Sequence, residues 1–242
     1  GSWFLAFPWI DGARAHHARL TVDQARTVGG LIAQMHLRDL EHPAAHAANW
    51  RSIPEEQWRS LAGRSAGRSA DQPWAATLSE QLPELIEMSD EYCVAADALG
   101  DEPTVIGHRD LDLKNVLWDD RGPWLIDWDS AGRVHPLVEL VTAAIDWSGF
   151  AGARTDRDLF VAVLDGYREH RPFDPNEAAR ALPAADVYLR WLEFNIRRAL
   201  GEAASPIDRA IGVVETVATL GNLRAAYDHR DRWREWILAS AD

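Results

Sequence analysis

Three side chains in the middle of the chain carry the oxygen atoms that phosphoryl transfer needs: Asp110, Asn115 and Asp127. Transfer of a phosphoryl group requires an acceptor hydroxyl held in line with the phosphate and a divalent metal that neutralises the phosphate oxygens. Mg²⁺ prefers oxygen ligands and keeps several waters, so one carboxylate and one amide oxygen suffice. A separate carboxylate then orients or deprotonates the acceptor. These residue types therefore indicate a phosphoryl-transfer site.

Short strands are expected to position these three side chains. Runs of β-branched and apolar residues predict three strands, the last two joined by a tight turn. The expected ranges are 103–108, 116–118 and 124–128 for the strands and 119–122 for the turn. This arrangement places Asp110 and Asn115 on one loop and Asp127 at the end of the last strand, so that the three groups share one mouth.

Helical patterns dominate the rest of the chain. A capping box of Thr21 and Gln24 begins one helix, and the Gly29-Gly30 pair inside it marks a place of close packing. A longer helix is expected at 73–99, bent or restarted near Pro83. After the last strand only helices are expected, at 136–148, 155–170, 175–200 and 206–238.

A near-repeat of Gly, Arg, Ser and Ala at 61–71 resembles a phosphate-binding P-loop only superficially. Gly63 and Gly67 are one residue too close together, and Arg68 stands where that motif has lysine. The segment is therefore interpreted as a flexible surface connection. Strands and helices do not alternate along the chain, so the predicted fold class is α+β and mostly α-helical, with a few short strands around the catalytic loop.

The central segment also matches a known pattern. His108-Arg109-Asp110 followed by Asn115 gives the spacing His-Arg-Asp-x-x-x-x-Asn of the protein-kinase catalytic loop, and Ile126-Asp127-Trp128 follows. Together with Gly107, Gly132 and the run Pro136 to Leu140, the segment resembles the aminoglycoside phosphotransferase and choline kinase family. The resemblance implies the C-terminal lobe of a protein-kinase-like fold.

The resemblance also implies roles for individual residues. Asp110 would be the catalytic base or orienting carboxylate, and Asn115 and Asp127 would be the Mg²⁺ ligands, with ATP or GTP as co-substrate. His108 would brace the loop. Further support in the catalytic loop would come from Arg109, Asp112 and Lys114. Glu139 stands where the family usually has aspartate, which lengthens one side chain.

The N-terminal residues resemble the hinge that joins the two lobes in this family. Residues 1–12 are interpreted as a tag remnant, Gly1-Ser2, followed by a hinge-like strand that ends in Ile-Asp-Gly, and 13–242 as a single C-lobe. In these kinases the preceding N-lobe supplies a loop over the phosphates and a strand lysine. The only lysine is Lys114, inside the catalytic loop, so the N-lobe is expected to be absent from this chain.

Three explanations of that absence stay open. In the first, the chain is a fragment of a full kinase. In the second, it is a natural C-lobe that binds a ligand or partner without catalysis. In the third, it is a C-lobe that another chain completes. The isolated chain is therefore expected to be inactive or weakly active. A metal-dependent hydrolase is a further alternative, but it would need a denser set of ligands, such as a second histidine beside Asp127.

Composition limits the partners. The net charge of −13 argues against nucleic acid and anionic membranes, and no apolar run is long enough to span a bilayer. A single cysteine, Cys93, fits a reducing cytoplasm. The expected partner is a small molecule that carries a hydroxyl group. A cationic acceptor would suit this acidic protein, as in antibiotic resistance by aminoglycoside phosphorylation. Acceptor-side candidates are Asp129, Asp146 and Glu193.

Overall fold

The computed structural model describes residues 9–10, 13–14, 20–38, 53–68, 72–100, 102–150, 155–185, 188–202 and 205–240. The helices are α1 (Val22–His36), α2 (Glu55–Arg68), α3 (Pro73–Leu99), α4 (Pro136–Trp147), α5 (Arg157–Arg168), α6 (Pro175–Ala181), α7 (Tyr188–Ala199) and α8 (Pro206–Ala239). The strands are β1 (Ala13–Arg14), β2 (Val105–Gly107), β3 (Val116–Asp119), β4 (Gly122–Leu125) and β5 (Gly132–Val134). Short 3-10 helices are η2 (Leu113–Asn115), η3 (Trp128–Ser130) and η5 (Leu182–Ala185). The tag remnant and most of the predicted hinge strand lie outside the described residues.

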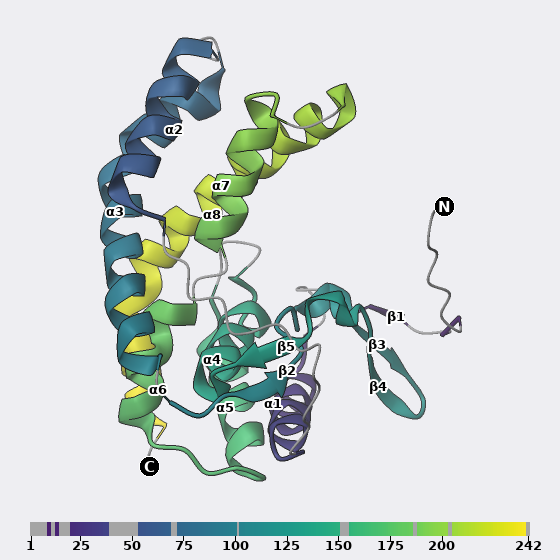
Figure 1. Ribbon diagram of the computed structural model, residues 1–242. Coiled ribbons are helices and arrows are strands. Elements are labelled where there is room, and N and C mark those ends of the chain that lie inside the picture. Colours follow the sequence, from purple (N-terminus) through teal and green to yellow (C-terminus); the bar gives the residue numbers. More distant parts are fainter. Residues whose placement is uncertain are drawn as a thin grey trace.

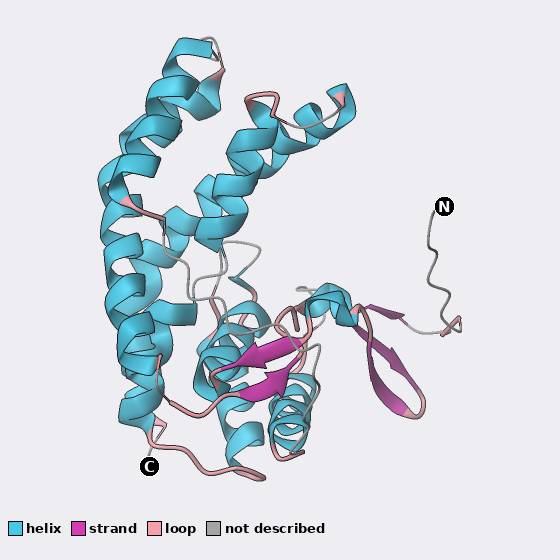
Figure 2. Cartoon of the chain, in the orientation of Figure 1, coloured by secondary structure: helices cyan, strands magenta, loops and turns pink. Residues whose placement is uncertain are grey.

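Helices form the body of the molecule, and the strands form two small antiparallel sheets (Figures 1 and 2). One sheet has the order β1-β3-β4, and the other pairs β2 with β5. The β3–β4 hairpin projects away from the helices, whereas β2 and β5 lie against α4 (Figure 1). The predicted class, mostly helical with a few short strands around the catalytic loop, is confirmed.

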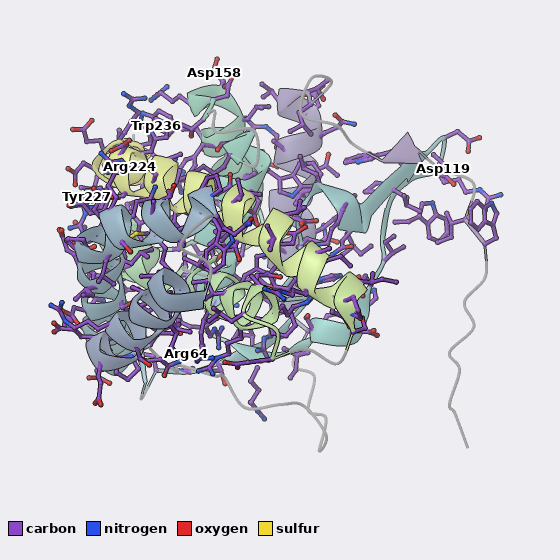
Figure 3. All side chains as sticks on the ribbon, turned by 90° about the horizontal axis from the view of Figure 1, so that it is seen from above. Arg64, Asp119, Asp158, Arg224, Tyr227 and Trp236 are labelled. Carbon is purple, nitrogen blue, oxygen red and sulfur yellow. The ribbon has the colours of Figure 1, made fainter. Side chains whose placement is uncertain are left out.

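Two apolar cores hold the helices together. One surrounds α1, α4 and α5 and includes the C-terminal end of α8; the other lies between α2, α7 and parts of α3 and α8. The long helices α3 and α8 run side by side and join both cores (Figure 1). Polar contacts support this pairing: Glu87 accepts hydrogen bonds from Tyr227 Oη at 2.7 Å and from Arg230 Nη2 at 3.0 Å. In Figure 3, Tyr227 and Arg224 lie on the opposite side of the molecule from Asp119 at the hairpin.

The helix α1 begins and packs as its sequence predicts. The side chain of Thr21 accepts from Gln24 N, and the Gln24 side chain accepts from Thr21 N, which completes the capping box. A Cβ added at Gly29 would lie 2.0 Å from Val163 O, and one added at Gly166 would lie 1.9 Å from Arg26 O. Only glycine lets α1 and α5 approach this closely, so the predicted close packing at Gly29-Gly30 is confirmed.

Two sequence-based expectations about helices were wrong. The segment 61–71 is not a connection: α2 continues to Arg68, because Trp58, Leu61 and Ser65 follow one another at helical spacing and are buried. The expected helix at 175–200 is also interrupted, since η5 contains Pro183 and separates α6 from α7. Helix α3, in contrast, runs through Pro83 as one element.

The strand β5 was not predicted from the sequence. Its three residues, Gly132–Val134, are too few to show a periodic pattern, and its antiparallel partner β2 stabilises it.

Among the described residues, no helix combines the length and the apolar character needed to cross a bilayer.

Candidate active site

The catalytic loop lies between β2 and β3 and is held to the body from both sides. Trp147 of α4 donates its indole N–H to Leu111 O at 3.0 Å. His108 is buried, and its Nε2 lies 2.9 Å from Ile126 O, while the Trp128 ring packs over it with centroids 4.6 Å apart. His108 therefore links the start of the loop to the segment that carries Asp127.

Within this loop, Asp110 is fixed by two neighbours. Asn115 Nδ2 donates to Asp110 O at 2.7 Å and to Asp110 Oδ2 at 3.0 Å. Lys114 Nζ lies 3.1 Å from Asp110 Oδ1 and 2.7 Å from Asp112 Oδ2. The carboxylate of Asp110 thus has a defined orientation at a partly exposed position, as an orienting group for an acceptor requires.

The segment just before Asp127 contacts Asn115, although β4 ends two residues before Asp127. The bond from Ile126 N to Asn115 O, at 3.0 Å, ties the two segments together. The Asp127 side chain is exposed and makes no capping bond to η3. The bond at Ile126 therefore joins the segment that carries Asp127 to the loop that carries Asp110 and Asn115, and the shared site of the three side chains stays a prediction.

Two residues of this region have left-handed backbone conformations. Arg109 has φ 66° and Asp127 has φ 62°, and they are the only non-glycine residues with positive φ in the described part of the chain. Each such residue costs about 1 kcal/mol or more and persists only where the surroundings fix it. Backbone strain concentrated on the two ends of one polar cluster is typical of a functional site.

A buried network of hydrogen-bonded side chains holds the strained backbone at Arg109. Glu139 of α4 accepts from Arg109 N through Oε1 at 2.6 Å, and its Oε2 lies 2.6 Å from His36 Nε2. The other ring nitrogen of His36 lies 3.0 Å from Tyr167 Oη. A Cβ at Gly107 would lie 2.0 Å from Glu139 Oε2, so glycine is required there. The sequence analysis noted Glu139 only because its side chain is longer than the aspartate usual at this position. No sequence pattern predicted that His36 and Tyr167 would belong to this network.

A cavity of about 110 Å³ lies between α3, α4, η5 and α8. Its wall includes Asp146 of α4, whose Oδ1 accepts from Tyr188 Oη at 2.8 Å, and the aromatic rings of Phe150 and Trp233. Burial raises the pKa of Asp146 to about 7, and the negative charges of Asp112 and Asp110 add to the effect, while the Tyr188 hydrogen bond opposes it. The cavity is therefore close enough to the catalytic loop for the two to interact electrostatically.

Comparisons with known proteins identify the family. The family model described as "Phosphotransferase enzyme family" matches residues 1–173, which is most of the chain.

The chain belongs to this phosphotransferase family.

Solved structures with the same fold include a spectinomycin phosphotransferase in complex with ADP and spectinomycin, with a TM-score of 0.63 at 15% identity over 91% of this chain and 70% of that one. An aminoglycoside phosphotransferase from Alicyclobacillus acidocaldarius has a TM-score of 0.55 at 13% identity over 94% and 70% of the two chains. A choline kinase from Cryptosporidium parvum has a TM-score of 0.53 at 11% identity over 96% and 72%. No curated protein matches the sequence. At these identities the structures establish a protein-kinase-like fold, and the family supports a small-molecule phosphotransferase.

The donor atoms of this phosphotransferase fit a Mg²⁺ ion with nucleotide phosphates. Both side-chain hydrogen bonds of Asn115 use its Nδ2, which leaves the amide oxygen available to a metal ion. Asp127 adds an exposed carboxylate on the neighbouring segment. One amide oxygen and one or two carboxylates are the hard oxygen ligands that Mg²⁺ accepts while it keeps several waters.

The structure separates the three acceptor-side candidates. Asp146 lines the cavity, as described. Asp129 lies in η3 and is exposed to solvent. Glu193 of α7 forms an ion pair with Arg197, with Oε1 2.9 Å from Nε, and also accepts from Gln57 of α2. Of the three, Asp146 is thus the one that lines this cavity.

Proposed function

We propose that the protein transfers the γ-phosphoryl group of ATP or GTP to a hydroxyl group of a small molecule. The observation that carries the proposal is the fixed carboxylate of Asp110, held by Asn115 Nδ2 at 3.0 Å in the loop to which Ile126, the neighbour of Asp127, is hydrogen-bonded. Asp110 orients the acceptor hydroxyl and takes up its proton as the bond to phosphorus forms. Because Asn115 and the surrounding backbone hold it, little reorganisation is needed at that moment.

The metal ligands in this proposal are Asn115 Oδ1 and the Asp127 carboxylate. When bound there, Mg²⁺ neutralises charge on the phosphate oxygens of the nucleotide. Asp127 has a left-handed backbone conformation, and the residue before it, Ile126, donates its N–H to Asn115 O at 3.0 Å. His108 keeps that segment in register with the loop through Ile126 O.

The acceptor site in this proposal is the cavity that contains Asp146. A carboxyl group beside the rings of Tyr188, Phe150 and Trp233 is the chemistry that recognises an ammonium group, through charge and through cation–π contact. A proton occupies Asp146 up to a pH near its pKa of about 7, and a cationic acceptor would displace it. Amino-sugar and amino-alcohol acceptors are therefore proposed before neutral ones.

The test is turnover of MgATP and MgGTP by the intact protein with a panel of hydroxylated amines and neutral sugars. Asp110→Asn keeps the shape of the side chain and its contact with Asn115 but removes the base. We expect turnover to fall by about 10³-fold or more, because general-base and positioning contributions are both lost. Full activity of Asp110→Asn would refute the assignment. Binding of an acceptor without turnover by the wild-type protein would instead indicate a catalytically incompetent binding module.

A further inference from the structure

Lys114 holds an unusual position within the catalytic loop. Its Nζ lies between two carboxylates, 3.1 and 3.2 Å from the two oxygens of Asp110 and 2.7 Å from Asp112 Oδ2. Asp112 also accepts from Lys114 N at 2.9 Å through Oδ1, so one carboxylate fixes both the backbone and the ammonium group of this lysine. The side chain is nevertheless half exposed, at 51%.

Stability does not explain this arrangement. Ion pairs between half-exposed groups contribute about 0–1 kcal/mol, and Asp110 already has a hydrogen bond from Asn115. The ammonium group of Lys114 pairs with both Asp110 and Asp112, so the loop has a positive group at its centre.

The residue type is also distinctive, because Lys114 is the one lysine among 25 basic residues, and all the others are arginine. An ammonium group is a compact point charge on a flexible stem, whereas a guanidinium group is a planar fork suited to fixed pairs. A mobile ammonium group can stay in contact with a phosphoryl group that moves between two oxygens more easily than a planar guanidinium group can. Lysine binds phosphate groups as such a point charge.

We propose that Lys114 is a catalytic residue that contacts the transferred phosphoryl group. This inference rests on the proposed function and adds one residue to those that take part in the reaction. A cation 3.1 Å from the carboxylate that orients the acceptor hydroxyl lies beside the path of that phosphoryl group. When a nucleotide is bound, the ammonium turns from Asp110 to a phosphoryl oxygen and keeps its contact with Asp112. Asp112 is then the positioning residue for Lys114.

The step in which Lys114 takes part is the displacement at phosphorus. The acceptor oxygen forms a bond to the γ-phosphorus, and the bond from that phosphorus to the bridging oxygen breaks, so that its electron pair remains on the leaving nucleoside diphosphate. The acceptor proton moves to Asp110. Lys114 keeps its own proton throughout and lowers the energy of the charged transition state, as preorganised donors do in other active sites.

The first experiment compares variants of the intact protein in steady-state kinetics. Lys114→Met should lower kcat about 10²-fold, the usual effect of removing one donor to a transition-state oxygen, with the nucleotide KM changed far less. Lys114→Arg keeps the charge and should recover a large part of the loss. Arg157→Met removes one positive charge from the exposed start of α5 and is the matched control, with kcat expected to be unchanged.

A second experiment measures phosphate contact without turnover. Affinity for MgADP with aluminium fluoride, which mimics the transferred group, should fall about 10²-fold in Lys114→Met while affinity for MgADP alone is retained. An acyl-phosphate derivative of ATP should acylate the Lys114 amine, with release of ATP, and mass spectrometry should find the modification on that peptide. A purely structural lysine would leave the two nucleotide affinities in the same ratio and would escape acylation.

The results separate this inference from the proposed function. If the wild type turns over, Asp110→Asn is inactive and Lys114→Met keeps full kcat, the phosphotransferase assignment stands and the role of Lys114 is refuted. If the wild type phosphorylates no acceptor but Lys114 is acylated and the aluminium fluoride complex depends on it, the phosphate contact stands and the acceptor chemistry is wrong. Absence of both acylation and the affinity change overturns the proposal for Lys114.

Discussion

Two carboxylates on α4, Glu139 near its start and Asp146 near its end, lie seven residues or about two helical turns apart and have opposite environments. Glu139 is 4% exposed, and both of its oxygens are occupied, one by Arg109 N and the other by His36. Asp146 accepts a hydrogen bond from Tyr188 and faces a cavity. The same helix therefore supports the catalytic loop at one end and presents a group with free lone pairs at the other.

This difference shows how one element can separate support from recognition. A buried carboxylate whose oxygens are all paired contributes to structure, because any change leaves its partners without hydrogen bonds. A carboxylate with a raised pKa and open lone pairs in a concave space is a candidate for ligand binding. On this basis Glu139 should act through the position of the loop, and Asp146 through affinity for the acceptor.

The largest expected effect is that of Glu139→Ala. Removing one partner of a buried pair typically costs about 3–5 kcal/mol, so the free energy of unfolding should fall by that order. In protein that remains folded, kcat should fall about 10²-fold because the loop is no longer held at Arg109. Denaturant unfolding and steady-state kinetics measure the two effects.

The control for this prediction is Glu139→Gln, which keeps an oxygen that can accept from Arg109 N. It should retain much more kcat than Glu139→Ala at the same temperature. An unchanged kcat in folded Glu139→Ala would contradict the supporting role and would make the two carboxylates of α4 equivalent.

A smaller effect, confined to the acceptor, is expected for Asp146→Asn. The acceptor KM should rise roughly tenfold or more, as when a hydrogen bond to a charged group is lost, while kcat and the nucleotide KM change little. Asp231→Asn, at the exposed rim of the same cavity, is the matched control and should change the acceptor KM far less. Equal effects of the two variants would mean that the cavity interior does not bind the acceptor.

The pH dependence of stability gives a third test of the comparison. Because the pKa of Asp146 is about 7 in the folded protein, above the 3.8 of an exposed carboxyl, the folded state holds this proton more tightly. Its contribution is therefore fully present below about pH 4 and is lost as the pH rises toward and through 7. The difference in unfolding free energy between wild type and Asp146→Asn should shrink with rising pH over this window and then level off. A constant difference would contradict the raised pKa.

The smallest effect is expected at Glu193, which represents an ordinary surface carboxylate. Its ion pair with Arg197 is partly exposed, so Glu193→Gln should change the free energy of unfolding by about 1 kcal/mol or less. Acceptor and nucleotide KM should stay as in the wild type. A tenfold rise in the acceptor KM would place the acceptor against α7 and away from the Asp146 cavity.

Local pattern predicted the elements well where one physical signal dominated. The Thr21 capping box, the strands β2, β3 and β4 and the helices α4, α5 and α8 followed from periodicity and from turn residues. The predictions failed where composition was misleading. Gly63 and Gly67 suggested a loop, but both glycines lie on the open side of α2 while its buried face packs against the neighbouring helices.

The sequence by itself determined the residues of the candidate site, because Asp110, Asn115 and Asp127 lie close together along the chain and short strands orient them. Only the tertiary structure decided what supports the site and what surrounds it. His36 reaches Glu139 across 103 positions, and Tyr188 reaches Asp146 across 42. Such pairs depend on how α1, α4 and α7 pack, and packing is set by the summed burial of many side chains, which no local spacing records.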